Sequence, residues 1–283
     1  MNTKEEITAF KPLKDFFIGI DSDGTAFDSM SIKHIKSMFP AAMEVWNMGD
    51  KREEFNKIWN KINLYSKTRG INRFPALLSA FDELKNSSPS VNAPDTSALR
   101  EFIQKSETFS NAALEAWMSE HPDPFLDEVM RWSKRSDELF DEHTINLLPF
   151  PNVKPCLALM AHNADIMVVS SASGKGLDKD WSFSGLTDYT SLVAGQETGS
   201  KKTQLKMGAA GKYPPRKILM IGDAPADMEA ARSIDALFFP VMPGSEDESW
   251  LLLREEALGR FFSGTFEGEY EDTLIKNFLD FLE

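Results

Sequence analysis

The chain has 283 residues, with 31 basic and 44 acidic side chains, so its formal net charge is 31 − 44 = −13. This acidic balance argues against a protein that coats nucleic acid or binds an anionic membrane, because either needs clustered basic side chains. One cysteine, Cys156, excludes an intramolecular disulfide framework, and no apolar run reaches the length of a membrane span. With 42% hydrophobic residues, the composition is that of a folded globular protein, which we expect to be soluble and cytoplasmic.

Short apolar runs followed at once by polar turn residues predict buried strands. These runs are residues 16–20 before DSDGT, 166–169 before SSASG, 191–194, 218–221 before GDAPAD, and 236–241 before PG. Helical stretches are expected between the later runs, at about 154–163, 201–210 and 225–234. Strands that alternate with helices predict an α/β fold, a Rossmann-like parallel sheet with helices on both faces. Each polar motif then lies at the carboxyl edge of the sheet, where such folds bind ligands.

Residues 29–149 show a different pattern. Apolar side chains recur at helical spacing there, as in Phe55, Ile58 and Trp59, and no convincing strand is visible. We interpret these aromatic stripes as the core of a helix bundle rather than a cofactor site. The sequence therefore predicts an α/β core domain formed by residues 1–28 and 150–283, with an all-helical domain, 29–149, inserted in it.

Four aspartates follow two of the predicted strands. Asp21 and Asp23 follow the first, and Asp223 and Asp227 lie in GDAPAD after the fourth. Carboxylates gathered at one sheet edge repel one another unless a cation neutralises them, and oxygen-only ligands suit a hard ion such as Mg²⁺. The alternative for any one of them is a turn or helix-capping aspartate.

The predicted edge also carries groups that can bind an anion. Ser170 and Ser171 follow a strand, so that a hydroxyl and backbone N–H groups could hold phosphoryl oxygens. Lys201 and Lys202 begin a predicted helix, where a lysine opposes the helix dipole unless an anion lies nearby. Turn serines and a solvated lysine pair are the structural alternatives. We prefer Lys201 as the binding lysine, with Lys202 as the second choice.

Taken in order, DxDGT at 21–25, a strand that ends in Ser170, Lys201 and GDxxxD ending at Asp227 resemble the haloacid dehalogenase (HAD) superfamily of phosphohydrolases. The helical insertion after the first motif is similar to the helical C1-type cap of that family. Within it, RGINR at 69–73 resembles the Gly-x-x-Arg loop of the β-phosphoglucomutase-like branch.

The resemblance implies a Mg²⁺-dependent phosphatase acting on a small phosphorylated metabolite through an aspartyl-phosphate intermediate. It implies Asp21 as the nucleophile and Asp23 as the general acid and base. The remaining implied site residues are, for the metal, Asp21, the backbone carbonyl of Asp23, Asp223 and Asp227; for phosphate, Thr25, Ser170, Ser171 and Lys201; and for the substrate, Arg69 and Arg73. Ion pairing is the structural alternative for the two arginines.

Other activities within the family remain open. A sugar phosphomutase is the main alternative, although its branch carries a cap histidine at the position of Lys33, and here His34 is one residue away. A phosphonatase would need a suitably placed cap lysine. A dehalogenase is disfavoured, because that chemistry lacks the acid/base group that Asp23 provides. A non-enzymatic binding module is disfavoured because every motif residue is present. The oligomeric state is left open.

Overall fold

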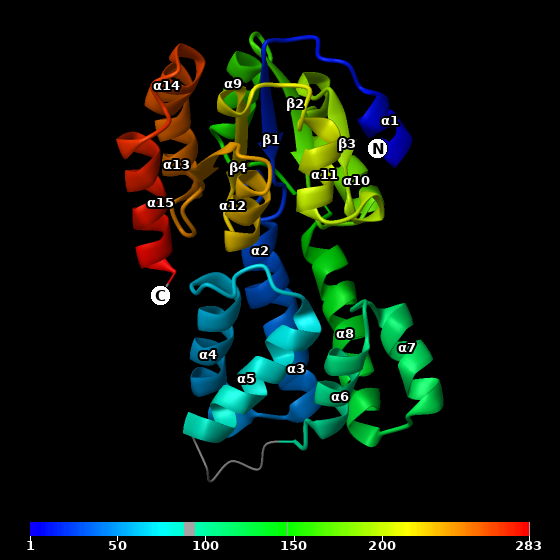
Figure 1. Cartoon of the computed structure of the whole chain (residues 1–283). Coiled ribbons are helices and arrows are strands. Elements are labelled where there is room, and N and C mark those ends of the chain that lie inside the picture. Colours follow the sequence, from blue (N-terminus) through cyan, green and yellow to red (C-terminus); the bar gives the residue numbers. More distant parts are fainter. Residues whose placement is uncertain (88–93, 146, 283) are drawn as a thin grey trace. The chain divides into compact units, whose positions relative to one another are not determined.

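The computed structural model describes residues 1–87, 94–145 and 147–282 (Figure 1). It divides into two compact units, Met1–Ser29 with Asn146–Glu283, and Met30–Ile145. The borders predicted after residues 28 and 149 differ from these by one and four residues. Pro149 lies with the first unit because it forms a bridge with Phe27, and the Phe150 N–H donates to the Ala26 carbonyl at 3.0 Å.

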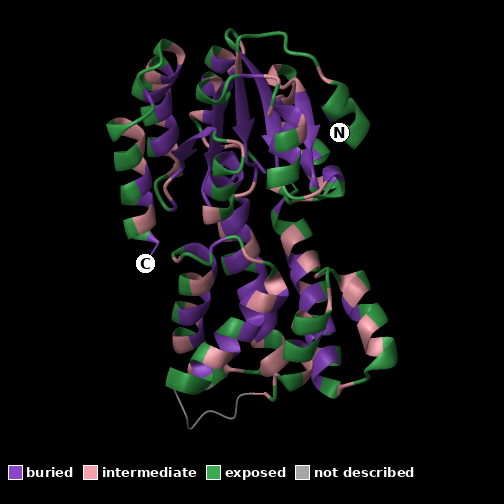
Figure 2. Cartoon of the chain, viewed as in Figure 1, coloured by how far each residue is buried: buried purple, intermediate pink, exposed green. Residues whose placement is uncertain are grey.

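The first unit contains a five-stranded sheet in the order β3-β2-β1-β4-β5, with every neighbouring pair parallel. The strands are β1 (Phe16–Ile20), β2 (Ala164–Val169), β3 (Leu192–Ala194), β4 (Ile218–Gly222) and β5 (Leu237–Pro240). Their residues are nearly all buried, as Figure 2 shows. This confirms the predicted α/β fold, in which a parallel sheet covered on both faces needs near-continuous apolar strands.

Helices cover both faces of this sheet. Alternate strand residues point to opposite faces. Phe17 packs in one cluster with Leu205, Met228 and Phe278, whereas the ring of Phe16 contacts helix α14 on the other face. The helices of this unit are α1 (Lys4–Ala9), α9 (Val153–Met160), α10 (Gly174–Phe183), α11 (Lys201–Gly208), α12 (Pro225–Arg232), α13 (Glu246–Leu252), α14 (Leu258–Ser263) and α15 (Glu269–Phe281), with a π-helical segment, Leu253–Ala257, between α13 and α14.

Two acidic segments of this unit lie at the starts of helices. Residues 246–249 form the first turn of α13, and residues 266–272 lead into α15. Acidic side chains stabilise a helix start because they oppose the positive end of its dipole. Glu271 also accepts a hydrogen bond from the Phe238 backbone N–H at 2.8 Å, which ties α15 to β5.

At the amino end of the sheet, the buried carboxylate of Asp165 gathers several donors. It accepts hydrogen bonds from the backbone N–H groups of Leu13 and Lys14 at 2.8 and 2.9 Å and from the Tyr213 hydroxyl at 2.8 Å. Burial raises the pKa of Tyr213, and Asp165 adds to that rise, so the phenol stays protonated as a donor. Asp165 is therefore a structural anchor at the edge opposite the DSDGT turn.

All the regular secondary structure in the described residues of the second unit, 30–87 and 94–145, is helical. Its elements are a π-helical segment, Ile32–Met38, and helices α3 (Phe39–Trp46), α4 (Arg52–Leu64), α5 (Arg73–Ser87), α6 (Ser97–Lys105), α7 (Asn111–Glu120) and α8 (Pro124–His143); a short helix, α2 (Ser29–Ser31), precedes them. Phe55, Trp59 and Trp132 are fully buried, and their rings pack against one another. The aromatic stripes thus form a core, as the sequence predicts. None of the described helices combines the length and apolarity that crossing a membrane requires.

Candidate functional site

Three aspartates meet at the carboxyl edge of the sheet. Ile20 is level with both Val168 and Ile221, so the residues that follow β1, β2 and β4 leave the sheet side by side. Asp21, Asp223 and Asp227 each present a carboxylate oxygen, and these oxygens lie within 4.8 Å of one another. All three residues are buried. The expected convergence of the two aspartate motifs is therefore found, although Asp23 contributes no carboxylate oxygen to this cluster.

Lys201, the first residue of α11, reaches into the carboxylate cluster. Its Nζ lies 2.9 Å from Asp21 Oδ2 and 2.6 Å from Asp227 Oδ1. Lys202, one position along the helix, is exposed and pairs with Glu229 instead. One residue of helix is about 100° of rotation, so only one of two successive lysines can face the sheet edge. The structure places the preferred lysine, Lys201, in the cluster.

Burial is the largest single influence on the pKa values of Asp21, Asp227 and Lys201. Burial raises the pKa of Asp21 well above its ordinary value; Lys201 opposes the rise, and Asp227 and Asp223 add to it. The pKa of Asp227 is raised for the same first cause. For Lys201, burial alone would lower the pKa, but the two carboxylates outweigh it and the pKa is raised. Lys201 is therefore protonated, and the surroundings of the two carboxyls favour the binding of a further positive charge.

Asp223, Asp227 and Asp23 are each also oriented by a specific hydrogen-bond donor. The Thr25 hydroxyl donates to Asp223 Oδ1 at 2.6 Å, and the Ala224 backbone N–H donates to Asp227 Oδ2 at 3.1 Å. Asp23, which is half-buried, accepts a short hydrogen bond of 2.5 Å from the Ser29 hydroxyl. Thr25, predicted to bind phosphate, therefore supports an aspartate of the cluster.

Two buried tryptophans hold the 21–25 turn from helices far along the chain. The indole N–H of Trp181, on α10, donates to the Ser22 hydroxyl at 3.0 Å. The indole N–H of Trp250, on α13, donates to the Thr25 carbonyl at 2.7 Å. Reasoning from sequence missed both residues, since neither belongs to a motif and each looks like an ordinary core side chain.

The two predicted serines differ in their placement. Ser170 is buried at the end of β2, and its Oγ accepts a hydrogen bond from the Ala172 N–H at 3.1 Å. Ser171 is exposed. Of the two, only Ser170 is held at the inner edge of the sheet.

The two predicted substrate arginines belong to the second unit. Arg73 pairs with Asp137 at 2.6 Å and donates to the Ser133 hydroxyl at 2.9 Å. Arg69 is buried and donates to the Leu64 carbonyl at 2.9 Å. Arg73 thus makes an ion pair, the structural alternative to a substrate contact. A substrate role for either arginine remains a prediction.

The donor set of the cluster fits a hard divalent cation. Three ionised carboxylates and one ammonium carry a formal charge of −3 + 1 = −2, which a divalent ion would cancel. All the side-chain ligands are carboxylate oxygens, with no imidazole or thiolate among the three residues. Oxygen-only sites of this kind suit Mg²⁺.

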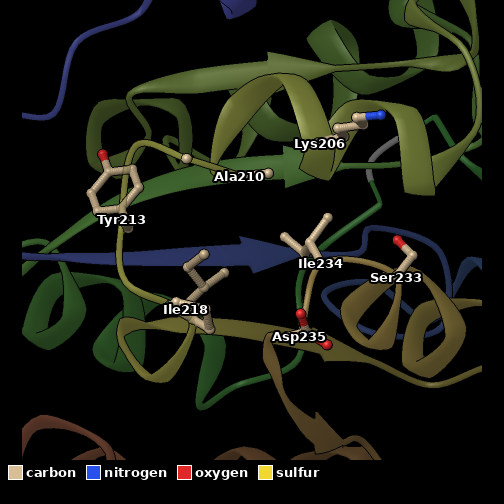
Figure 3. Close-up of a pocket in the computed structure, with 9 residues that line it drawn as sticks. Lys206, Ala210, Tyr213, Ile218, Ser233, Ile234 and Asp235 are labelled. Atoms are coloured by element: carbon tan, nitrogen blue, oxygen red, sulfur yellow. The ribbon is translucent and has the colours of Figure 1, made fainter.

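A separate surface pocket of about 450 Å³ lies at the other edge of the sheet. Its lining includes Tyr213, Ile218 and Ser233, at the amino ends of β4 and β5 (Figure 3). It contains none of the predicted site residues. Since open α/β sheets bind their ligands at the carboxyl edge, the carboxylate cluster is the better candidate for function.

Gly222 makes room for the Asp227 side chain. A Cβ at position 222 would lie 2.6 Å from Asp227 Oδ2 and closer still to its Cβ and Cγ. Since two non-bonded heavy atoms cannot approach so closely, Asp227 would have to move. Because Gly222 has no side chain, Asp227 can enter the carboxylate cluster.

We expect Gly222→Ala to displace Asp227 and to lower the free energy of unfolding by about 1–3 kcal/mol, as overpacked cores do. Urea titration measures this loss, and calorimetric titration with Mg²⁺ should show weakened binding. Gly259→Ala is the matched control, because a Cβ there meets nothing within 4 Å and the position is helical. Equal stability and Mg²⁺ affinity in the two variants would contradict this role of Gly222.

The raised pKa of Asp21 predicts a specific pH dependence in metal-free protein. The folded state binds the Asp21 proton more tightly than the unfolded state, so stability falls as pH rises from about 4 towards the folded-state pKa. Asp21→Asn removes this loss. In EDTA, the variant should therefore have a higher Tm than the parent at pH 7.5, with the difference shrinking towards pH 4.

Asp280→Asn is the control for that comparison. Because Asp280 forms only an exposed pair with Lys276, Tm should change little at either pH value. A lower Tm for Asp21→Asn at pH 7.5 would mean that the ion pair with Lys201 outweighs burial, contrary to this account.

Comparison with solved structures finds several relatives of low identity. A HAD-superfamily hydrolase of subfamily IA from Geobacter sulfurreducens PCA is 16% identical, with a TM-score of 0.43 over 81% of this chain and 88% of that one. A predicted phosphoglycolate phosphatase from Haemophilus somnus 129PT is 18% identical, with a TM-score of 0.47 over 82% and 88%. A 2-haloacid dehalogenase from Pseudomonas syringae pv. tomato DC3000 is 18% identical, with a TM-score of 0.38 over 79% and 84%. A search of curated proteins finds no match.

The family model for haloacid dehalogenase-like hydrolases matches residues 71–241, more than half of the chain. The matched range includes Ser170, Lys201, Asp223 and Asp227, and the fold brings Asp21, which lies outside it, to the same place. The finer assignment to the β-phosphoglucomutase-like branch remains a prediction. The chain belongs to the haloacid dehalogenase-like hydrolases.

Proposed function

We propose that this hydrolase is a Mg²⁺-dependent phosphatase that cleaves the phosphate monoester of a small metabolite. The observation that carries the proposal is the buried contact of Asp21 with Lys201 beside Asp223 and Asp227. A carboxylate held in this way can attack an electrophile, while the cationic groups around it can offset the charge of a phosphoryl group.

In the first step, an Asp21 carboxylate oxygen attacks phosphorus and the bond from phosphorus to the leaving oxygen breaks. Lys201 supports this step in two ways. Its ammonium opposes the effect of burial on the pKa of Asp21 and so favours the ionised, nucleophilic form, and it can stabilise the negative charge on the transferring group. In the second step, water attacks phosphorus, the bond to Asp21 breaks and inorganic phosphate leaves.

Asp23 is proposed to move the proton in both steps. It donates a proton to the leaving oxygen and then takes one from the attacking water. Asp23 is half-buried and outside the carboxylate cluster, and the Ser29 hydroxyl fixes one of its oxygens. This carboxyl favours phosphate chemistry over dehalogenation, because a halide leaves without needing a proton.

Mg²⁺ would be held by Asp21 and Asp223, together with the Asp23 backbone carbonyl, with Asp227 as a ligand or a supporting group. When bound, it would supply Lewis-acid stabilisation of a phosphoryl oxygen. Ser170 and Lys201 are proposed to hold the phosphoryl group. Thr25 orients Asp223, and Arg69 or Arg73 remains a proposed contact to the rest of the substrate.

The test is hydrolysis of p-nitrophenyl phosphate with Mg²⁺ or with EDTA. We expect turnover only with Mg²⁺, its loss in Asp21→Asn, and a fall of at least about 100-fold in kcat/KM in Lys201→Ala, since a buried charge stabilising the transition state is removed. Lys202→Ala is the matched control and should retain wild-type kinetics, because Lys202 pairs with Glu229 on the surface.

Turnover that survives Asp21→Asn would contradict the nucleophilic role. Conversion of a sugar 1-phosphate to its 6-phosphate without release of inorganic phosphate would favour the mutase alternative. Failure of purified protein to hydrolyse any ester on a broad panel of phosphorylated metabolites would overturn the proposed function.

A further inference from the structure

Gln204 makes an unusual set of hydrogen bonds beside the proposed site. The residue lies on α11, one turn after Lys201, and is fully buried. Its Nε2 lies 2.9 Å from each of three backbone carbonyl oxygens, those of Ser170, Gly195 and Gly199. One side-chain amide thus joins the ends of two neighbouring strands to the turn that leads into α11.

The orientation of this amide is determined by the three carbonyls. Only an NH₂ group can face three acceptors, because the reverse orientation would bring Oε1 against three oxygens that repel it. As a result Gln204 Oε1 is buried with no hydrogen-bond partner among the described residues. An unpaired buried acceptor is unfavourable, so the hydrogen bonds that the amide NH₂ group donates must offset that cost.

The three carbonyls belong to the segments that carry the proposed phosphate-binding groups. Ser170 supplies its own carbonyl, directly at the end of β2. Gly199 lies two residues before Lys201 and has a φ of 108°, a conformation that favours glycine and turns the chain into α11. Through this carbonyl, Gln204 ties the start of the helix, and with it the backbone of Lys201, to the end of β2.

We propose that Gln204 is a positioning residue for phosphoryl transfer. Its amide sets the separation between Ser170 and Lys201, the two side chains proposed to hold the transferring group. Gln204 acts through these residues and touches no reacting atom. The inference rests on the proposed function, because it assigns a catalytic consequence to a contact within that site.

A small displacement of groups that stabilise charge affects the transition state more than the bound substrate. The proposal therefore predicts a loss in kcat with little change in KM. A purely structural role would lower thermal stability and leave the kinetics of the folded enzyme unchanged. The split between kcat and KM is the readout that separates the two.

The test uses the full chain with Mg²⁺ and p-nitrophenyl phosphate, assayed well below the Tm of each variant. Gln204→Met keeps the length of the side chain but removes its donors, and Gln204→Asn keeps the amide but shortens its reach. We expect both to lower kcat at least about tenfold, with KM within about threefold of wild type. Inhibition by vanadate, a phosphoryl mimic, should weaken in parallel with kcat.

Tyr213→Phe is the matched control. It removes a buried hydrogen bond to Asp165 at the opposite edge of the sheet and should lower Tm without changing kcat or KM. Gln204 variants that lose stability but keep wild-type kcat, or that fail to fold, would overturn the positioning role. Absence of Asp21-dependent turnover in the wild type would instead overturn the proposed function itself.

Discussion

The contact of Lys201 with Asp21 and Asp227 is the interaction on which the carboxyl edge of the sheet depends. Three carboxylate oxygens lie within 4.8 Å of one another, and at an effective dielectric constant of about 20 each pair repels by about 3–4 kcal/mol. One ammonium group contacts two of the three carboxylates. Burial, to which the remaining negative charge adds, raises the pKa values of Asp21 and Asp227. The remaining negative charge leaves a site suited to a divalent cation.

Residues that do no chemistry maintain this arrangement from distant parts of the chain. The indole of Trp181 reaches a residue 159 positions away, and that of Trp250 a residue 225 positions away, so that α10 and α13 clamp the turn after β1. Gly222 leaves room for Asp227, and the Gln204 amide joins the ends of β2 and β3 to α11. The carboxyl edge of the sheet is therefore held in place by the space that Gly222 leaves, by two indole hydrogen-bond donors and by one amide. The ionisable groups lie between them.

Local patterns were enough to predict the strands and the convergence of the aspartates. An apolar run followed by a polar turn is a local signal, and parallel strands bring such turns to one edge whatever the intervening sequence. The contacts of Trp181, Trp250 and Gln204 depend on which residues the fold brings opposite them, and no local pattern contains that information. The distinction between Lys201 and Lys202 was predicted only as a preference, because it depends on the rotation of α11 about its axis.

The most direct test of the central claim is a crystal structure of the protein grown with Mn²⁺, which can stand in for Mg²⁺ and is located by its anomalous scattering. We expect an anomalous peak that marks an ion bound by carboxylate oxygens of Asp21 and Asp223, with Lys201 still beside Asp227. A peak elsewhere on the chain, or none at saturating Mn²⁺ while Lys201 still bridges the two carboxylates, would contradict it.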